Sequence, residues 1–145
     1  MRDLPRQLSA EQLAELFEGR TRLVERLAET ESPLEHADVA VAALSEDEKI
    51  EALSAHPAIG AKNLSARSGI EQGSDSDPAI LSELAYLNQV YEEKFGFRFV
   101  VFVAERPRAE LLGVLRERLE RSREEELETG IRELVAIARD RWTRT

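Results

Sequence analysis

Apolar residues recur at intervals of three and four along most of the chain, which is the spacing of one face of an α-helix. The first predicted helix opens with a capping-box pattern at Ser9 and Gln12, and Gly19 is its predicted stop. Its predicted core residues are Leu13, Leu16 and Phe17. A second predicted helix places its core residues at Leu23, Val24 and Leu27.

A third helix is predicted to begin at Ser32, because Pro33 suits the first helical position and Glu35 completes the capping pattern. Its expected buried face holds Val39, Ala40, Ala43 and Leu44.

The fourth predicted helix is short and opens with the capping pattern Ser45-Glu46-Asp47-Glu48, with Ile50 and Leu53 inside. It must end at His56, because Pro57 cannot donate a helical hydrogen bond and pushes the preceding residue out of the α region. Residues 57 to 77 then carry few apolar side chains and many Ser, Gly and Asp. So long a loop in a compact domain is usually functional or disordered.

The second half of the chain predicts three more helices. One begins at Asp77-Pro78 and ends at Gly96, with a core face of Leu81, Leu84, Leu87, Asn88, Tyr91 and Phe95. The next begins at Pro107, with core residues Leu111, Leu112, Leu115 and Leu119. The last is capped by Ser122-Arg123-Glu124-Glu125 and buries Leu127, Ile131, Leu134, Val135 and Ala138.

Residues Phe97 to Val103 form an apolar run whose aromatic and β-branched content by itself favours a strand. A lone strand would have no partner, so an extended or helical buried segment fits at least as well. With about seven to eight helices and no convincing sheet, the sequence predicts an all-α, single-domain bundle over residues 1–145.

Composition narrows the function classes. The chain has 145 residues, 42% of them hydrophobic and 34% charged, which is typical of one soluble globular domain. It has no cysteine and only two histidines, which disfavours a metal site and excludes a thiolate nucleophile. The net charge of −9 disfavours nucleic acid as a partner. No transmembrane stretch or signal peptide is recognisable, so we expect no membrane partner and a cytoplasmic location.

His56 is the first candidate for chemistry. Pro57 fixes its backbone, and the dipole at the C-terminal end of a helix is expected to favour the imidazolium form. The alternative is a histidine that only caps helix carbonyls, and a lone histidine does not decide between them. His36, among charged neighbours within a predicted helix, is interpreted as a surface residue.

Two further candidates are polar. The segment Ser68-Gly69-Ile70-Glu71-Gln72 resembles a capping box, yet no apolar helical run follows it. Its hydroxyl, carboxylate and amide could instead hydrogen-bond a ureido or imidazolone group. Arg118 lies on a predicted helix, where it is either a solvated residue or an anion anchor with a bidentate guanidinium.

Four motifs follow one another in the chain: His56-Pro57 with Gly60, Ser68-x-x-Glu71-Gln72, Leu87-Asn88-x-x-Tyr91, and the run from Phe95-Gly96-Phe97 to Val103. In this order and spacing they resemble the OHCU decarboxylases. Segments Ala109–Leu112, Arg118-Leu119 and Val135–Arg139 add to the likeness, which covers roughly residues 45 to 142. The chain differs in having Ala58 where the family has Asp, a shorter spacing between His56 and Glu71, and a divergent N-terminal region.

The resemblance implies an all-α, commonly dimeric enzyme that uses no metal or organic cofactor. It would convert 2-oxo-4-hydroxy-4-carboxy-5-ureidoimidazoline (OHCU), the product of 5-hydroxyisourate hydrolysis in urate breakdown, into CO2 and (S)-allantoin. The implied catalytic residues are His56 and Glu71. The implied substrate-binding residues are Pro57, Ser68, Gly69, Ile70, Glu71, Gln72, Phe99, Val100, Val101, Phe102, Val103 and Arg118.

Two other functions compete with this one. The first is a cofactor-free decarboxylase or hydrolase acting on a related ureido compound, which the change to Ala58 would permit. The second is a helical interaction module in which His56 and Glu71 are structural. That alternative predicts no shared pocket around them, and no exposed heptad or large apolar stripe supports it.

Overall fold

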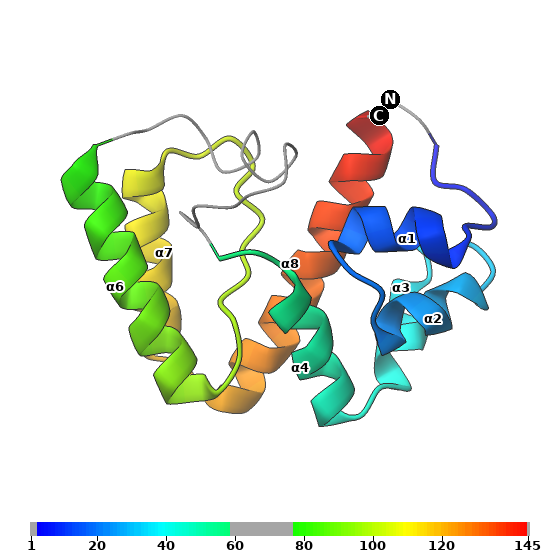
Figure 1. Cartoon of the computed structure of the whole chain (residues 1–145), viewed down its shortest axis with the longest axis horizontal. Helices are drawn as coiled ribbons and strands as arrows, with labels where there is room; N and C mark the ends of the chain where they lie inside the picture. The colour runs from blue at the N-terminus through cyan, green and yellow to red at the C-terminus, as the bar shows by residue number, and fades with distance from the viewer. Residues whose placement is uncertain (1–2, 59–76, 145) are drawn as a thin grey trace.

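Seven α-helices make up most of the computed structural model, which describes residues 3–58 and 77–144, and no β-strand occurs in these ranges (Figure 1). The predicted all-α fold is therefore confirmed. The helices are α1 (Ala10–Phe17), α2 (Arg22–Ala28), α3 (Ala37–Ala42), α4 (Glu46–Ala55), α6 (Pro78–Phe95), α7 (Arg108–Leu119) and α8 (Arg123–Arg144). No described helix is both long and apolar enough to cross a bilayer.

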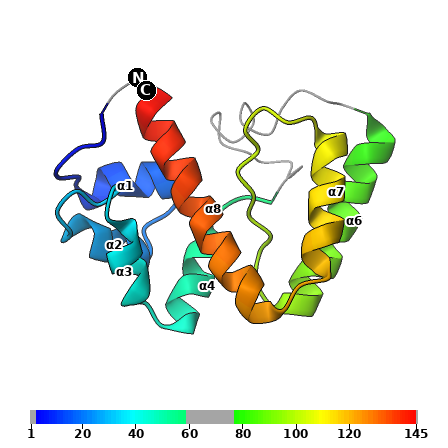
Figure 2. The same ribbon diagram turned by 180° about the vertical axis from the view of Figure 1, so that it is seen from behind.

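Helix α8 runs through the middle of the molecule, with α1, α2 and α3 on one side and the parallel pair α6 and α7 on the other (Figures 1 and 2). Helix α4 packs against both α8 and α2, so it joins the N-terminal group of helices to the centre. The C-terminal end of α4, where His56 lies, is thereby brought beside the segment that connects α6 to α7.

Most helix ends lie where the local sequence signals predict them. Capping boxes form at Ser9 and Ser45. At the start of α8, the Glu125 N–H donates to the Ser122 hydroxyl and the Ser122 N–H donates to the Glu125 carboxylate, which is the same pattern. Asp77 caps α6, and Gly96 ends it with a φ of 81°. At the end of α1, the left-handed residue is Glu18 rather than the predicted Gly19.

The third helix begins later than predicted. It starts at Ala37 because Ser32 turns the chain with a φ of 50° and donates its backbone N–H to the Arg6 carbonyl, 2.8 Å away. These tertiary contacts replace the expected first turn, and the helix is rotated as a result. Val39 is 62% exposed and Ala43 is also exposed, so their predicted burial is wrong, whereas Ala40 and Leu44 are buried as expected.

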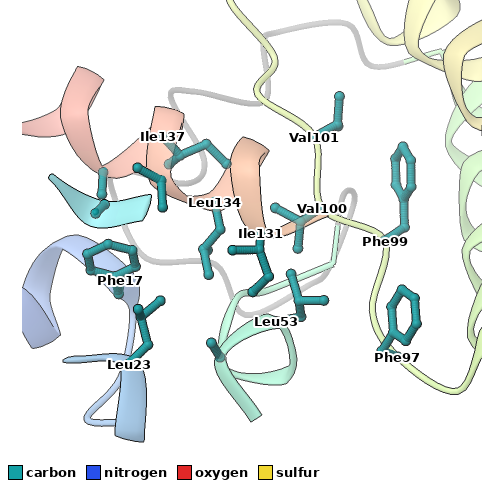
Figure 3. Close-up of a cluster of buried hydrophobic side chains, with 14 of the residues drawn as sticks. Phe17, Leu23, Leu53, Phe97, Phe99, Val100, Val101, Ile131, Leu134 and Ile137 are labelled. Carbon is teal, nitrogen blue, oxygen red and sulfur yellow. The ribbon is translucent and has the colours of Figure 1, made fainter. Parts of the chain in front are cut away.

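The segment from Phe97 to Val103 is extended, and no described strand pairs with it. Phe97 and Phe99 point to one side, and Val100 points to the other, toward Ile131 of α8 (Figure 3). Side chains bond its backbone in place of a partner strand: Arg118 donates to the Val100 carbonyl, and the Phe102 N–H donates to Glu133. Of the strand, the helical segment and the extended segment that the sequence allowed here, the structure shows the extended, buried one.

Candidate active site

His56 ends α4 in an extended conformation, with φ −80° and ψ 136°. Its N–H still bonds the Leu53 carbonyl at 3.2 Å, whereas Pro57 has no N–H to continue the helix. The side chain is only 8% exposed. The predicted helix end is thus confirmed, and it places an imidazole inside the protein.

The end of α1 packs closely on the end of α4. A Cβ atom added at Gly19 would lie 3.1 Å from the Cβ of Ala55, so this approach suits a residue without a side chain. The neighbouring Glu18 carboxylate lies 3.1 Å from Nη2 of Arg141, a residue of α8 that is 3% exposed. Glu18 and Arg141 therefore bring one negative and one positive charge toward His56 from α1 and α8.

Burial lowers the pKa of His56 from the ordinary 6.5 to about 4, and the positive charges of Arg141 and Arg98 add to this effect. Glu18 acts in the opposite direction and does not offset the others. The prediction that the helix dipole would favour imidazolium is therefore wrong. Desolvation and two guanidinium groups outweigh the dipole, and His56 is neutral near pH 7.

The Nδ1 atom of His56 is buried and makes no hydrogen bond with any described residue. Buried polar atoms in proteins nearly always have a partner, so an unpartnered ring nitrogen needs a reason. In a neutral imidazole, one nitrogen accepts and the other donates, so Nδ1 is available to a bound molecule in either role.

Arg118 is buried, with a side chain 6% exposed. Its Nε donates to Glu126 at 2.7 Å, its Nη1 donates to the Val100 carbonyl at 2.7 Å, and the guanidinium lies 4.5 Å from the centre of the Phe99 ring. The solvated alternative is thus excluded. Nη2 has no hydrogen-bond partner among the described residues, and the role of Arg118 as an anion anchor stays a prediction.

The predicted residues fall into three groups. His56 and Pro57 lie at the end of α4, Arg118 and the segment 99–103 are bonded to each other, and Ser68, Gly69, Ile70, Glu71 and Gln72 lie outside the described residues. Whether Glu71 and Gln72 approach His56 stays a prediction.

Three charged residues around His56 were not predicted from the sequence: Glu18, Arg98 and Arg141. The position of Arg141 could have been recognised from the sequence. It continues the buried stripe of Leu127, Ile131, Leu134 and Ala138 at helical spacing, a position where a charged side chain has to find partners inside the protein. Neither Glu18 nor Arg98 has a comparable pattern around it.

A separate groove of about 600 Å³ lies between α3, α4 and α8, lined among others by Val41, Lys49, Ile131, Arg132 and Arg139. None of the predicted site residues lines this groove. It is therefore distinct from the surroundings of His56.

Comparisons with known proteins agree with the motifs. The chain is 37% identical over 98 residues to the uric acid degradation bifunctional protein TTL of Arabidopsis thaliana, covering 61% of this chain and 30% of that protein. It is 30% identical over 99 residues to the 2-oxo-4-hydroxy-4-carboxy-5-ureidoimidazoline decarboxylase of Halalkalicoccus jeotgali, covering 65% and 56%. The matched region thus spans about a third of the length of the first relative and about half of the length of the second.

Solved structures give the same answer for the fold. A crystal structure of OHCU decarboxylase in the presence of (S)-allantoin matches with a TM-score of 0.77 and 27% identity, over 92% of this chain and 96% of that one. A crystal structure of (S)-allantoin synthase matches with a TM-score of 0.67 and 25% identity, over 93% and 47%. The family model described as OHCU decarboxylase matches residues 2–143, and the chain therefore belongs to the OHCU decarboxylase family.

Proposed function

We propose that this protein decarboxylates OHCU to (S)-allantoin and CO2 in urate breakdown, with His56 as its acid–base residue. The observation that carries the proposal is the buried, neutral imidazole, whose Nδ1 has no partner among the described residues and which feels the charges of Arg141 and Arg98. We further propose that the enzyme is a cytoplasmic homodimer that needs no metal or organic cofactor, as the family resemblance implies.

The two arginines explain how an anionic substrate would bind to an acidic protein. The chain carries a formal net charge of −9, which repels anions at long range. Arg141 and Arg98 together outweigh the negative charge of Glu18 at His56, so the local potential there is positive. A substrate carboxylate placed beside His56 would meet this positive charge where little water screens it.

Decarboxylation replaces the carboxylate of the substrate with a proton. The electron pair of the broken carbon–carbon bond passes into the conjugated ring, and the carbon then needs a proton on one face. A neutral imidazole suits the relay of that proton, because one nitrogen accepts while the other donates. Acid–base help of this kind is typically worth about 10²- to 10⁴-fold in rate.

The remaining contacts come from the predicted residues. We propose that Glu71, Gln72 and Ser68 hold the ureido and ring N–H and carbonyl groups, together with Gly69, Ile70, Pro57 and the backbone of 99–103. Glu71 would also orient the imidazole. Binding of the ring in one orientation would let the proton arrive from one side and give one enantiomer of allantoin.

The test is His56→Ala, assayed by the optical activity of allantoin formed from freshly generated OHCU. We expect the enantiomeric excess and the enzymatic rate to be lost, by about 10²-fold or more. His36→Ala is the matched control, because His36 is exposed and immediately precedes α3 in the chain. A folded His56→Ala protein with wild-type turnover would exclude the proposed role of His56. A wild-type protein without activity on OHCU would favour a related ureido substrate.

A further inference from the structure

Arg98 bonds the last turn of the helix that carries His56. Its Nη1 atom donates to the His56 carbonyl at 2.8 Å and, at a longer 3.4 Å, to the Ser54 carbonyl. Both carbonyls lie at the C-terminal end of α4, whereas Arg98 lies in the segment between α6 and α7. One side chain therefore connects two parts of the candidate site that are 42 residues apart in the chain.

The end of α4 needs a donor from elsewhere. The last carbonyls of any helix have no partner within the helix, and a following residue in the left-handed conformation usually supplies the missing N–H groups. Here that residue is Pro57, which has no N–H. His56 itself is extended, with ψ 136°. The Arg98 guanidinium takes the place of the missing cap.

Arg98 is itself held from the α6 side. Its Nη2 lies 3.7 Å from the Glu92 carboxylate, and the flanking residues Phe97 and Phe99 are almost fully buried. Phe97 and Phe99 both pack on Tyr91 of α6, at ring-centre distances of 6.0 and 5.2 Å. The base of the Arg98 side chain is thus anchored in the aromatic core around α6.

We propose that Arg98 is a positioning residue for His56, which locks the end of α4 to the 97–103 segment so that the imidazole and the backbone of that segment keep a fixed separation. The inference rests on the proposed function in one respect, since it gives His56 a catalytic task. The contact itself, and its effect on the imidazole, can be tested without any activity.

The charge of Arg98 provides a readout that a purely structural contact would not. The groups that act on His56 are Arg141 from α8, Glu18 from the end of α1, and Arg98 from the 97–103 segment. Removing the positive charge of Arg98 should raise the pKa of His56, and opening the end of α4 to water should raise it further.

The experiment compares Arg98→Gln, Arg98→Lys and wild type by NMR titration of the histidine rings. The chain has only two histidines, so the ring signals of His56 can be distinguished from those of His36 in each protein. We expect the His56 midpoint to rise in Arg98→Gln and to return toward wild type in Arg98→Lys, which restores a charged donor. On OHCU, we expect kcat to fall about 10-fold or more in Arg98→Gln with a smaller change in KM, and partial rescue in Arg98→Lys.

Arg116→Gln is the matched control. Arg116, like Arg98, pairs with a glutamate of α6, but among the described residues no hydrogen bond or ion pair joins it to α4. It should leave the His56 titration and kcat unchanged. An unchanged His56 midpoint and an unchanged kcat in folded Arg98→Gln would overturn the proposal. If the wild-type protein is inactive on OHCU, the proposed function fails, whereas the NMR comparison still decides whether Arg98 controls His56.

Discussion

Arg118 and Glu126 form an ion pair shielded from solvent, with Nε and Oε1 2.7 Å apart and side chains 6% and 0% exposed. The Tyr91 hydroxyl donates to the same carboxylate oxygen at 2.6 Å, and Arg121 approaches the other oxygen at 3.2 Å. Through Arg118, this network reaches the Val100 carbonyl. It thus fixes the extended segment to α6, α7 and α8 without a neighbouring strand.

Glu126→Gln should destabilise the protein strongly. The change leaves the buried Arg118 guanidinium without its counter-charge, and breaking a buried pair in this way costs about 3–5 kcal/mol. Tyr91→Phe removes only one hydrogen bond to a charged group and should cost about 1.5–3 kcal/mol. Urea unfolding measures both. Glu83→Gln, which breaks the exposed pair with Arg116, is the control and should cost at most about 1 kcal/mol. Equal losses for Glu126→Gln and Glu83→Gln would contradict the central role of this network.

The sequence predicts those features that depend on neighbouring residues. Ser9, Ser45 and Asp77 cap helices through bonds to residues two or three positions away, so their patterns are visible in the chain itself. The helix end at His56 was also predictable, because Pro57 alone imposes it. The start of α3 was not, since Ser32 is turned by a bond to Arg6.

The protonation state of His56 was not predictable either, because it depends on residues far away in the chain. The helix dipole is a local feature and argues for imidazolium. Burial, Arg98 and Arg141 reverse this, and all three depend on how distant segments pack. The protonation state of His56 is therefore set by tertiary structure, although the His56-Pro57 dipeptide is enough to predict that a histidine ends this helix.

The low pKa of His56 predicts the pH dependence of the enzyme. A neutral imidazole persists in the ligand-free folded protein down to about pH 4, so the acidic limb of the kcat/KM profile should have its midpoint near there and not near 6.5. Stopped assays on freshly generated OHCU, from about one pH unit below this midpoint up to pH 8, would measure it. A midpoint near 6.5 would show that His56 is solvated in the working enzyme.

The same shift links His56 to stability. The pKa is lower in the folded state than in the unfolded state, so the unfolded chain takes up a proton first as the pH falls. The contribution of His56 is complete above pH 6.5 and is lost between 6.5 and about 4, by an amount on the order of 3 kcal/mol. Urea unfolding of wild type and His56→Asn should therefore give a difference in unfolding free energy that changes with pH across this window. A difference that is constant over the window would contradict the low pKa.

Gly96 should be needed for its backbone conformation alone. Its φ is +81°, and a Cβ atom added there would meet nothing within 4 Å. Gly96→Ala should therefore cost about 1 kcal/mol through left-handed strain without a clash. Gly113 is the matched control: it lies inside α7 with equally open space, and Gly113→Ala should stabilise by about 0.5–1 kcal/mol. Thermal unfolding distinguishes the two, and shifts in the same direction would refute this explanation.

Arg141 should affect activity and stability by separable routes. Its Nη1 donates to the Leu16 carbonyl at 2.9 Å, and its Nη2 pairs with Glu18, whose side chain is only 16% exposed. Arg141→Gln should therefore lower stability by about 3 kcal/mol, because the Glu18 carboxylate loses its main counter-charge. It should also raise the pKa of His56 and the KM for the anionic substrate.

The double variant Arg141→Gln with Glu18→Gln separates the two effects. Removing both charges leaves no uncompensated carboxylate, so urea unfolding should show that much of the lost stability returns. The positive potential beside His56 is not restored, so kcat/KM on OHCU should stay low. If the double variant recovered activity together with stability, Arg141 would act only as the partner of Glu18, and its charge would have no part in binding the substrate.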